Sequence, residues 1–165
     1  MGVRLLLGTA VAIVLATAAD ARWEKSAKVD RITGETSVSF GVITMRTKVT
    51  GSSRTVGASA SMNCIEGKPH ILFHFGFPVG NDGNGFVAYR FDDLPGKKPA
   101  ASFFNLSSPF ISNPADVNAF LSDAAAAKKV LYLRVTSTLG AAEAEFDIRG
   151  GEKAVSEFRK SCPAS

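Results

Sequence analysis

The chain has 165 residues, of which 45% are hydrophobic and 21% are charged, and its formal net charge is +4. This length and composition fit one globular domain and exclude an intrinsically disordered chain, because hydrophobic content is high and phenylalanine alone contributes 12 residues. The 19 basic and 15 acidic residues are scattered, whereas nucleic-acid binding calls for a clustered basic stripe. We therefore predict no nucleic-acid partner.

The first 21 residues have the pattern of a secretory signal peptide. Arg4 precedes an apolar run over residues 5–15, and Ala19-Asp20-Ala21 places small residues at the two positions that a signal peptidase reads. We predict cleavage after Ala21 and one exported β-rich domain over residues 22–165, in the periplasm or secreted. The alternative is an uncleaved membrane anchor, but the apolar run does not exceed the roughly 18–20 residues of a spanning helix. No membrane span is predicted after cleavage.

Alternating apolar and polar residues predict a strand-rich first half of the domain. The clearest alternation places Phe73, Phe75 and Phe77 on one face. Residues 48–53 are polar and are predicted as a turn. Residues 80–85, rich in glycine and asparagine, predict a hairpin turn that pairs the strands on either side of it. The predicted strands cover residues 36–43, 58–65, 70–77, 86–93 and 100–106.

Two helices are predicted in the second half. Asn113 is a suitable N-cap and Pro114 occupies the first helical position, where its missing N–H costs nothing. Lys128 and Lys129 are expected to close this helix, which spans residues 114–128. The second helix begins after Gly150 and spans residues 151–162. The apolar stripes are Val117, Phe120, Leu121 and Ala124 in the first helix, and Ala154, Val155, Phe158 and Cys162 in the second.

Between the helices, residues 130–136 and 142–149 alternate as the two strands of a hairpin. We predict that Leu133 lies opposite Phe146, because this places every apolar residue opposite another one. The same register places Arg134 opposite Glu145 on the other face, which is a favourable cross-strand pair. A slip of one residue would expose the whole apolar set.

The only two cysteines, Cys64 and Cys162, are predicted to form a disulfide in the oxidising compartment that the signal peptide implies. In the chain-entropy model such a bond stabilises the domain by about 4–5 kcal/mol. The alternatives are two free buried thiols or a reactive thiol, although no Cys-x-x-Cys motif is present. The predicted fold class is therefore α+β, mainly antiparallel β-sheet or sandwich, with two helices (about 114–128 and 151–162) tied by this bond.

No motif in the sequence predicts catalysis, a metal or a cofactor. His70 and His74 share a strand face, but four residues of strand separate them by about 13 Å, which is too far to share a metal. No serine stands in a Gly-x-Ser-x-Gly turn. Residues 80–85 lack the Lys-Ser/Thr ending of a phosphate-binding loop and precede no predicted helix.

One charged cluster, Arg90, Asp92 and Asp93, lies at the end of the predicted strand at residues 86–93. Its first interpretation is that surface charges order the turn before Leu94. Its second interpretation is a candidate contact patch for a partner. In the second case Arg90 projects away from the apolar face and serves binding rather than stability.

Four features in this order resemble the VasI/TagO-like family of bacterial envelope proteins, which is associated with type VI secretion. They are Trp23, Met62-Asn63-Cys64, Tyr89-Arg90-Phe91-Asp92-Asp93, and Ala144-Glu145-Phe146-Asp147-Ile148-Arg149-Gly150 followed by a helix ending in Cys162. The family commonly has Trp after that cysteine, whereas this chain has Pro163. The resemblance implies a non-enzymatic accessory role with an envelope protein partner and supplies no catalytic residues.

Two hypotheses about function follow. The first is a non-enzymatic periplasmic accessory or interaction module, associated with a type VI secretion system. The second is a periplasmic hydrolase or small-ligand binder that uses the polar face around Arg90, with inhibition of a wall-active enzyme as a further binding role. The sequence predicts no oligomeric state.

Overall fold

The computed structural model describes residues 23–50, 56–79, 86–137 and 140–162. The predicted signal peptide and the predicted turn at residues 80–85 lie outside these residues. Ten strands and two helices are assigned: β1 (Glu24–Val29), β2 (Thr36–Thr44), β3 (Thr47–Val49), β4 (Ala58–Ile65), β5 (Lys68–Phe75), β6 (Phe86–Phe91), β7 (Ser102–Asn105), β8 (Ser108–Ile111), α1 (Pro114–Ala126), β9 (Val130–Ser137), β10 (Gly140–Asp147) and α2 (Gly151–Ser161).

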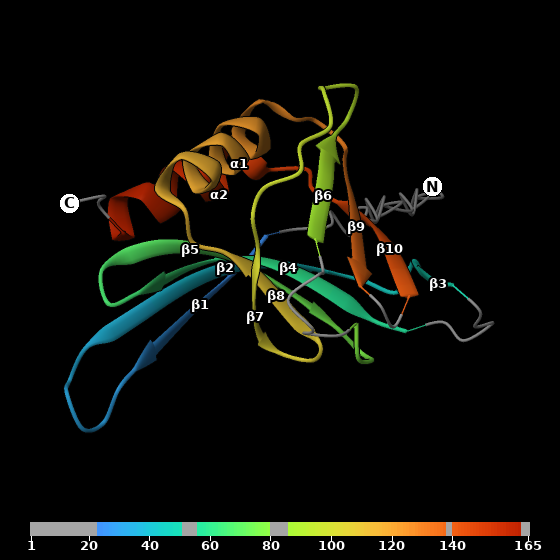
Figure 1. Cartoon of the computed structure of the whole chain (residues 1–165). Coiled ribbons are helices and arrows are strands. Elements are labelled where there is room, and N and C mark those ends of the chain that lie inside the picture. Colours follow the sequence, from blue (N-terminus) through green and yellow to red (C-terminus); the bar gives the residue numbers. More distant parts are fainter. Residues whose placement is uncertain (1–22, 51–55, 80–85, 138–139, 163–165) are drawn as a thin grey trace, which may run out of the picture.

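The strands form two antiparallel sheets, which confirms the predicted α+β class. One sheet has six strands in the order β1-β2-β4-β5-β8-β7, and the other has four in the order β3-β10-β9-β6. Both helices and the four-stranded sheet lie over the same face of the six-stranded sheet, side by side (Figure 1). Each sheet therefore has one face on a shared core and one outer face.

Aromatic rings join these layers in the core. Phe120 of α1 contacts Phe73 of β5 and Phe91 of β6, with ring centroids 5.8 and 5.0 Å apart. Phe158 of α2 contacts Phe40 of β2 at 6.3 Å. The side chains of all these residues are at least 97% buried, so removing any one of them would open a cavity.

The predicted disulfide is confirmed. Cys64 near the end of β4 is bonded to Cys162 at the C-cap of α2, with Cα atoms 5.6 Å apart. Cys162 is 3% exposed. The bond therefore attaches the last helix to the middle of the six-stranded sheet.

Both helices begin where they were predicted. The Asn113 side chain accepts hydrogen bonds from the N–H groups of Ala115 and Asp116, at 2.9 and 3.3 Å. The first helix ends at Ala126 rather than at residue 128, because the backbone N–H groups of the next residues, Lys128 and Lys129, are bonded to the carboxylate of Asp92. The second helix spans Gly151–Ser161.

The predicted register of the last hairpin is wrong by two residues. Leu131, not Leu133, lies opposite Phe146, and Arg134 lies opposite Glu143 rather than Glu145. A shift of two residues keeps every side chain on its own face, because side chains alternate with a period of two. Alternation therefore identified the two faces correctly and could not choose between these registers.

The predicted pairing of residues 86–93 with residues 70–77 is also wrong. β6 pairs with β9 in the four-stranded sheet, while β5 pairs with β4 and β8 in the other sheet. The strand ends at Phe91 because Asp92 has a φ of 42°, outside the extended region. In addition, β3 covers part of the predicted turn at residues 48–53, and β1 and β8 were not predicted.

Candidate functional site

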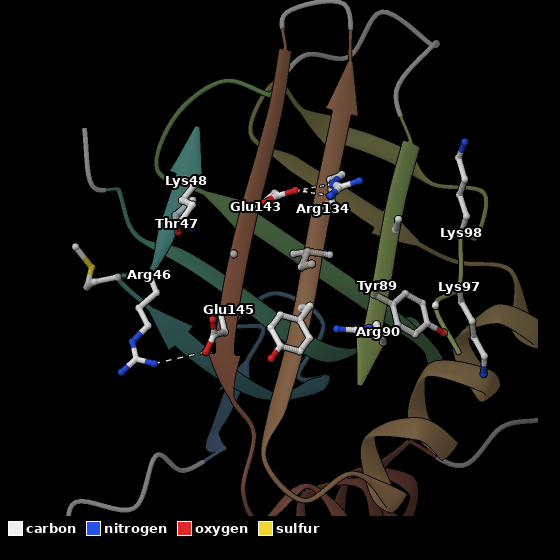
Figure 2. A pocket seen from close by; sticks show the side chains of 16 residues that line it. Arg46, Thr47, Lys48, Tyr89, Arg90, Lys97, Lys98, Arg134, Glu143 and Glu145 are labelled. Carbon is white, nitrogen blue, oxygen red and sulfur yellow. Dashed lines mark hydrogen bonds and ion pairs between the residues drawn. The ribbon is translucent and has the colours of Figure 1, made fainter. Parts of the chain in front are cut away.

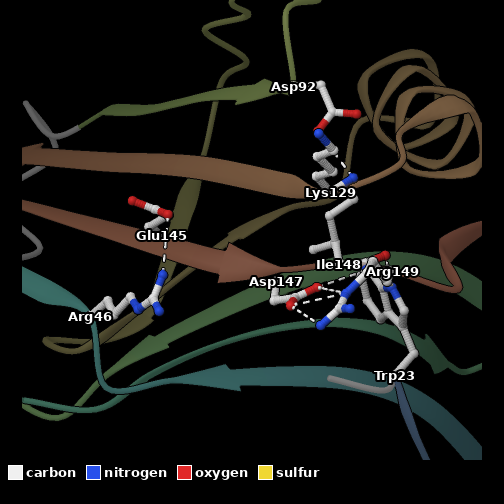
Figure 3. Close-up of polar contacts among 8 residues, drawn as sticks. All are labelled: Trp23, Arg46, Asp92, Lys129, Glu145, Asp147, Ile148 and Arg149. Atoms are coloured by element: carbon white, nitrogen blue, oxygen red, sulfur yellow. Dashed lines mark hydrogen bonds and ion pairs between the residues drawn. The ribbon is translucent and has the colours of Figure 1, made fainter. Parts of the chain in front are cut away.

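The structure separates the three residues of the predicted contact patch. Asp92 accepts hydrogen bonds from the backbone N–H groups of Lys128, Lys129 and Val130, at 2.6, 3.1 and 2.8 Å. Figure 3 shows Asp92 with Lys129. Asp93 is exposed in the following turn, and Arg90 projects from the outer face of β6. Asp92 therefore has a structural role, which is to hold the start of β9 rather than to order the turn before Leu94.

The electrostatics of Asp92 fit this role. Partial burial opposes its ionisation, but the three backbone N–H donors and the nearby charge of Lys129 outweigh it and hold the pKa of Asp92 below its usual value. The ionised carboxylate fixes the start of β9 against the end of β6. The relative position of these two strands on the outer face therefore depends on Asp92.

The residues of the family resemblance also have structural contacts. The indole Nε1 of Trp23 donates to the carbonyl of Ile148 at 3.1 Å, which fastens the start of the described chain to the end of β10 (Figure 3). Asp147 accepts from the guanidinium of Arg149 at 2.7 Å. This hydrogen bond is the main reason that the pKa of Asp147 is lowered, and partial burial opposes it.

A groove of about 910 Å³ lies on the outer face of the four-stranded sheet (Figure 2). The strand registers arrange its floor in two rows that cross the sheet. The first row contains Arg90, Tyr132 and Glu145, and the second contains Ala88, Arg134, Glu143 and Lys48. The residues between them in sequence, such as Leu133 and Ala144, are buried in the core. The small side chain of Ala88 leaves the second row open beside β6.

A short segment that folds back along β6 builds one rim of the groove. The N–H of Tyr89 donates to the carbonyl of Lys97 at 2.9 Å, and the N–H of Lys97 donates back at 2.8 Å. This pairing places Lys97 and Lys98 beside the sheet. Figure 2 shows these two lysines on one side of the groove and Arg46 with Lys48 on the other.

The groove carries an excess of positive charge. Its lining contains six cationic side chains, on Arg46, Lys48, Arg90, Lys97, Lys98 and Arg134, and two carboxylates, on Glu143 and Glu145. Arg134 pairs with Glu143 at 2.6 Å and Arg46 with Glu145 at 3.6 Å, while Lys97 pairs with Asp123 of α1 at 2.6 Å. Within the described part of the chain, Lys48, Arg90 and Lys98 have no carboxylate partner. These three cations are the surplus.

Two of the surplus cations lie over aromatic rings. The guanidinium of Arg90 lies 5.0 Å from the ring centroid of Tyr132, and Nζ of Lys98 lies 3.5 Å from that of Phe86. Such contacts hold a cation in place without neutralising it. They also cover one face of each ring, so neither ring presents that face for stacking against a ligand.

The two histidines make separate contacts from β5. His74 contacts the hydroxyl of Ser108 at 2.9 Å, and His70 contacts the carbonyl of Lys68 at 3.0 Å, both from β5. Among the described residues, no three His, Cys, Asp or Glu side chains come together as metal ligands. Ser108 is only 4% exposed, so the Ser108–His74 contact does not present an accessible nucleophile.

No helix within the described ranges has the length and apolar character needed to cross a membrane. No family model, curated protein or solved structure matches this chain. The resemblance to the VasI/TagO-like family therefore stays a prediction. The groove is therefore the candidate site on which a proposal of function can be based.

Of the groove residues, the sequence singled out only Arg90 as a site candidate. Arg134 and Glu145 were predicted as a cross-strand pair on the polar face of the hairpin, and the alternation that identified this face was the available signal. Lys48, Lys97 and Lys98 gave no signal, because they reach the groove through strand pairings between distant segments.

Proposed function

We propose that this protein is a non-enzymatic binding module that holds an acidic segment of a protein partner in the groove. The observation that carries the proposal is the surplus of three cations, Lys48, Arg90 and Lys98, in a groove already supplied with ion pairs. An acidic partner would satisfy these charges, and opposite charge across an interface favours both encounter and specificity. The envelope setting suggested by the sequence remains part of this proposal, and the disulfide supports an oxidising compartment.

The spacing of the surplus cations favours an extended ligand. Lys48 on β3 and Arg90 on β6 are separated by three strand spacings, which is about 14 Å. A single phosphate or carboxylate cannot reach both. A segment with several carboxylates can bridge the rims.

The floor of the groove favours a polypeptide over an anionic glycan. Sugar rings bind to open aromatic faces, whereas the guanidinium of Arg90 lies over the ring of Tyr132 on the groove floor. Glu143 and Glu145, between the cationic rims, would accept hydrogen bonds from peptide N–H groups. An acidic segment could therefore place its carboxylates on the rims and its backbone over the glutamates.

The alternative of a hydrolase finds less support in the groove. Its sixteen lining residues include no serine, cysteine or histidine, which are the usual nucleophile and base of hydrolytic sites. The type VI secretion setting is likewise proposed only on the sequence resemblance. A partner captured through the groove would identify the pathway.

Fluorescence anisotropy with a labelled hexaglutamate peptide tests the proposal. We expect Arg90→Glu with Lys98→Glu to weaken binding by at least about tenfold, and a higher salt concentration to weaken the wild type. The matched control is Lys68→Glu with Lys153→Glu, which makes the same change in net charge at exposed positions outside the groove.

Two results would contradict the proposal. Equal losses in the groove and control variants would show that the peptide responds to net charge alone. Heparin that binds more tightly than the peptide, with the same dependence on Arg90 and Lys98, would replace the acidic polypeptide by an anionic glycan.

A further inference from the structure

The strand β1 forms a free edge of the six-stranded sheet. All six of its residues are exposed, and among the strands of the described residues its one neighbour is β2 (Figure 1). The N–H of Asp30 donates to Glu35 in the β1–β2 hairpin. Since hydrogen-bonded pairs alternate along an antiparallel ladder, the even-numbered residues of β1 bond to β2. The N–H and C=O groups of Lys25, Ala27 and Val29 therefore point to the free edge.

The same alternation is found across the whole sheet. Gly76 donates to Gly57 between β5 and β4, and Phe75 donates to Ser107 between β5 and β8. The odd-numbered residues of β4 are bonded to β5, so the even-numbered residues of β4 are bonded to the even-numbered residues of β2. The odd-numbered residues of β2 are therefore bonded to the even-numbered residues of β1. The odd-numbered residues of β1 are again left at the outer edge. Six backbone polar groups are thus available for pairing with another strand.

We propose that two copies of this chain pair through β1 in an antiparallel arrangement, with Ser26 facing Ser26 on the two-fold axis. Lys25 of each copy then exchanges backbone hydrogen bonds with Ala27 of the other. The interface uses the same segment in both copies, so the assembly closes as a dimer and does not extend into a fibre. This inference does not depend on the proposed function.

Charge selects this register among those that the backbone permits. Residues whose backbone N–H and C=O groups point to the free edge must lie opposite one another in the dimer, so the permitted registers differ by steps of two residues. In the proposed register Glu24 faces Lys28 of the second copy, twice per dimer. One step in one direction brings Glu24 to face Asp30, and one step in the other brings Lys25 to face Lys25. Like charges directly opposite each other are destabilising.

The charged residues of β1 therefore select one pairing register. Charges on an edge strand normally prevent pairing with other chains, and here they oppose the neighbouring registers while favouring one. On the inner face, Lys25 lies 5.5 Å from the ring centroid of Phe40, and in the dimer it would face the small side chain of Ala27. Val29, which is 57% exposed, would come beside Trp23 of the second copy.

Pairing through β1 leaves the groove open. The groove lies on the four-stranded sheet, whereas β1 belongs to the six-stranded sheet. A dimer would therefore present two grooves. A partner with two acidic segments could bind both and gain avidity if its linker spans them.

Sedimentation velocity of the purified, disulfide-bonded protein, from about 1 µM to about 1 mM, tests the proposal. We expect a reversible dimer that is weakened about tenfold by Glu24→Lys, because two attractive pairs become repulsive. Combining Glu24→Lys with Lys28→Glu restores opposite charges in the same register and should restore the dimer.

A second variant tests the backbone pairing separately. Ala27→Pro removes an N–H that points to the free edge, a position where proline is tolerated, and it should abolish the dimer while circular dichroism shows an unchanged fold. A wild type that stays monomeric throughout the range would overturn the proposal. A dimer that survives Ala27→Pro, or a double charge swap that fails to restore association, would do the same.

Discussion

The outer faces of the two sheets differ, although both cover the same core. On β4, a central strand of the six-stranded sheet, the outward polar side chains are short and bonded: Asn63 donates to the hydroxyl of Ser61 at 2.8 Å, and Ser61 donates to the carbonyl of Leu72 at 3.3 Å. On the four-stranded sheet the side chains are long and charged, and the number of cations exceeds the number of carboxylates.

This difference is the reason why we propose the outer face of the four-stranded sheet as the binding face. Short polar groups that satisfy one another leave little for a ligand to contact. Long charged side chains among which cations outnumber carboxylates are still able to form ion pairs, and a partner of opposite charge can form them. The two outer faces therefore differ, and on the four-stranded sheet three cations of the groove have no carboxylate partner within the described residues.

The largest effect is expected from the disulfide, which joins α2 to β4. Replacing Cys64 and Cys162 by serine should lower the free energy of unfolding by about 2–5 kcal/mol, because the last helix loses its bond to β4. Urea denaturation measures this loss. Peptide binding to the folded fraction should stay unchanged, and a loss of binding at full folding would show that the groove depends on the bond.

Asp92 should affect the four-stranded sheet alone. Asp92→Asn removes the charge that three backbone N–H groups share, and we expect a loss of about 1–2 kcal/mol at pH 7. Because folding lowers the pKa of Asp92, its contribution is present above the unfolded value of 3.8 and is lost as the pH falls through the folded pKa.

The pH dependence supplies the control for this prediction. Urea unfolding of wild type and Asp92→Asn at pH 7 and at about pH 2.5 should show a difference that shrinks at low pH. Asp147, whose pKa is also lowered, loses its contribution in both proteins and cancels in the comparison. A difference that is independent of pH would mean that shape, not charge, makes Asp92 important.

The sequence predicted local features better than distant ones. Asn113 and Pro114 define the start of α1 within their own segment, and alternation identified the faces of the last hairpin. The strand beside β6 is β9, whose paired residues are 40 to 50 positions away in the sequence, and any apolar face would satisfy the alternation of β6. The groove combines the β9–β10 hairpin with two such distant pairings, so it could not be assembled from the sequence.

Arg90 separates binding from stability. The side chain of Arg90 is exposed and lies over Tyr132, so Arg90→Ala should change the free energy of unfolding by no more than about 0.5 kcal/mol and the melting temperature by about 1–2 °C. Peptide binding should fall clearly. Thermal unfolding together with anisotropy on the same sample checks both, and a large loss of stability would contradict the assignment of Arg90 to binding.

The smallest effect is expected at Thr47. Its Oγ1 is buried and has no hydrogen-bond partner within the described residues, although its neighbour Lys48 lines the groove. Thr47→Val keeps the shape and removes the unsatisfied oxygen, so stability should stay equal or rise slightly. A loss above about 1 kcal/mol in urea denaturation would show that the hydroxyl has a partner in solution.

The most direct test of the difference between the two outer faces is an NMR titration of the isotope-labelled protein with the hexaglutamate peptide. The account predicts that backbone amide shifts change in β6, β9 and the segment around Lys98, saturate together, and leave Ser61 and His74 of the six-stranded sheet unchanged. Changes centred on Ser61 and His74, or none at a peptide concentration that saturates the anisotropy signal, would contradict it.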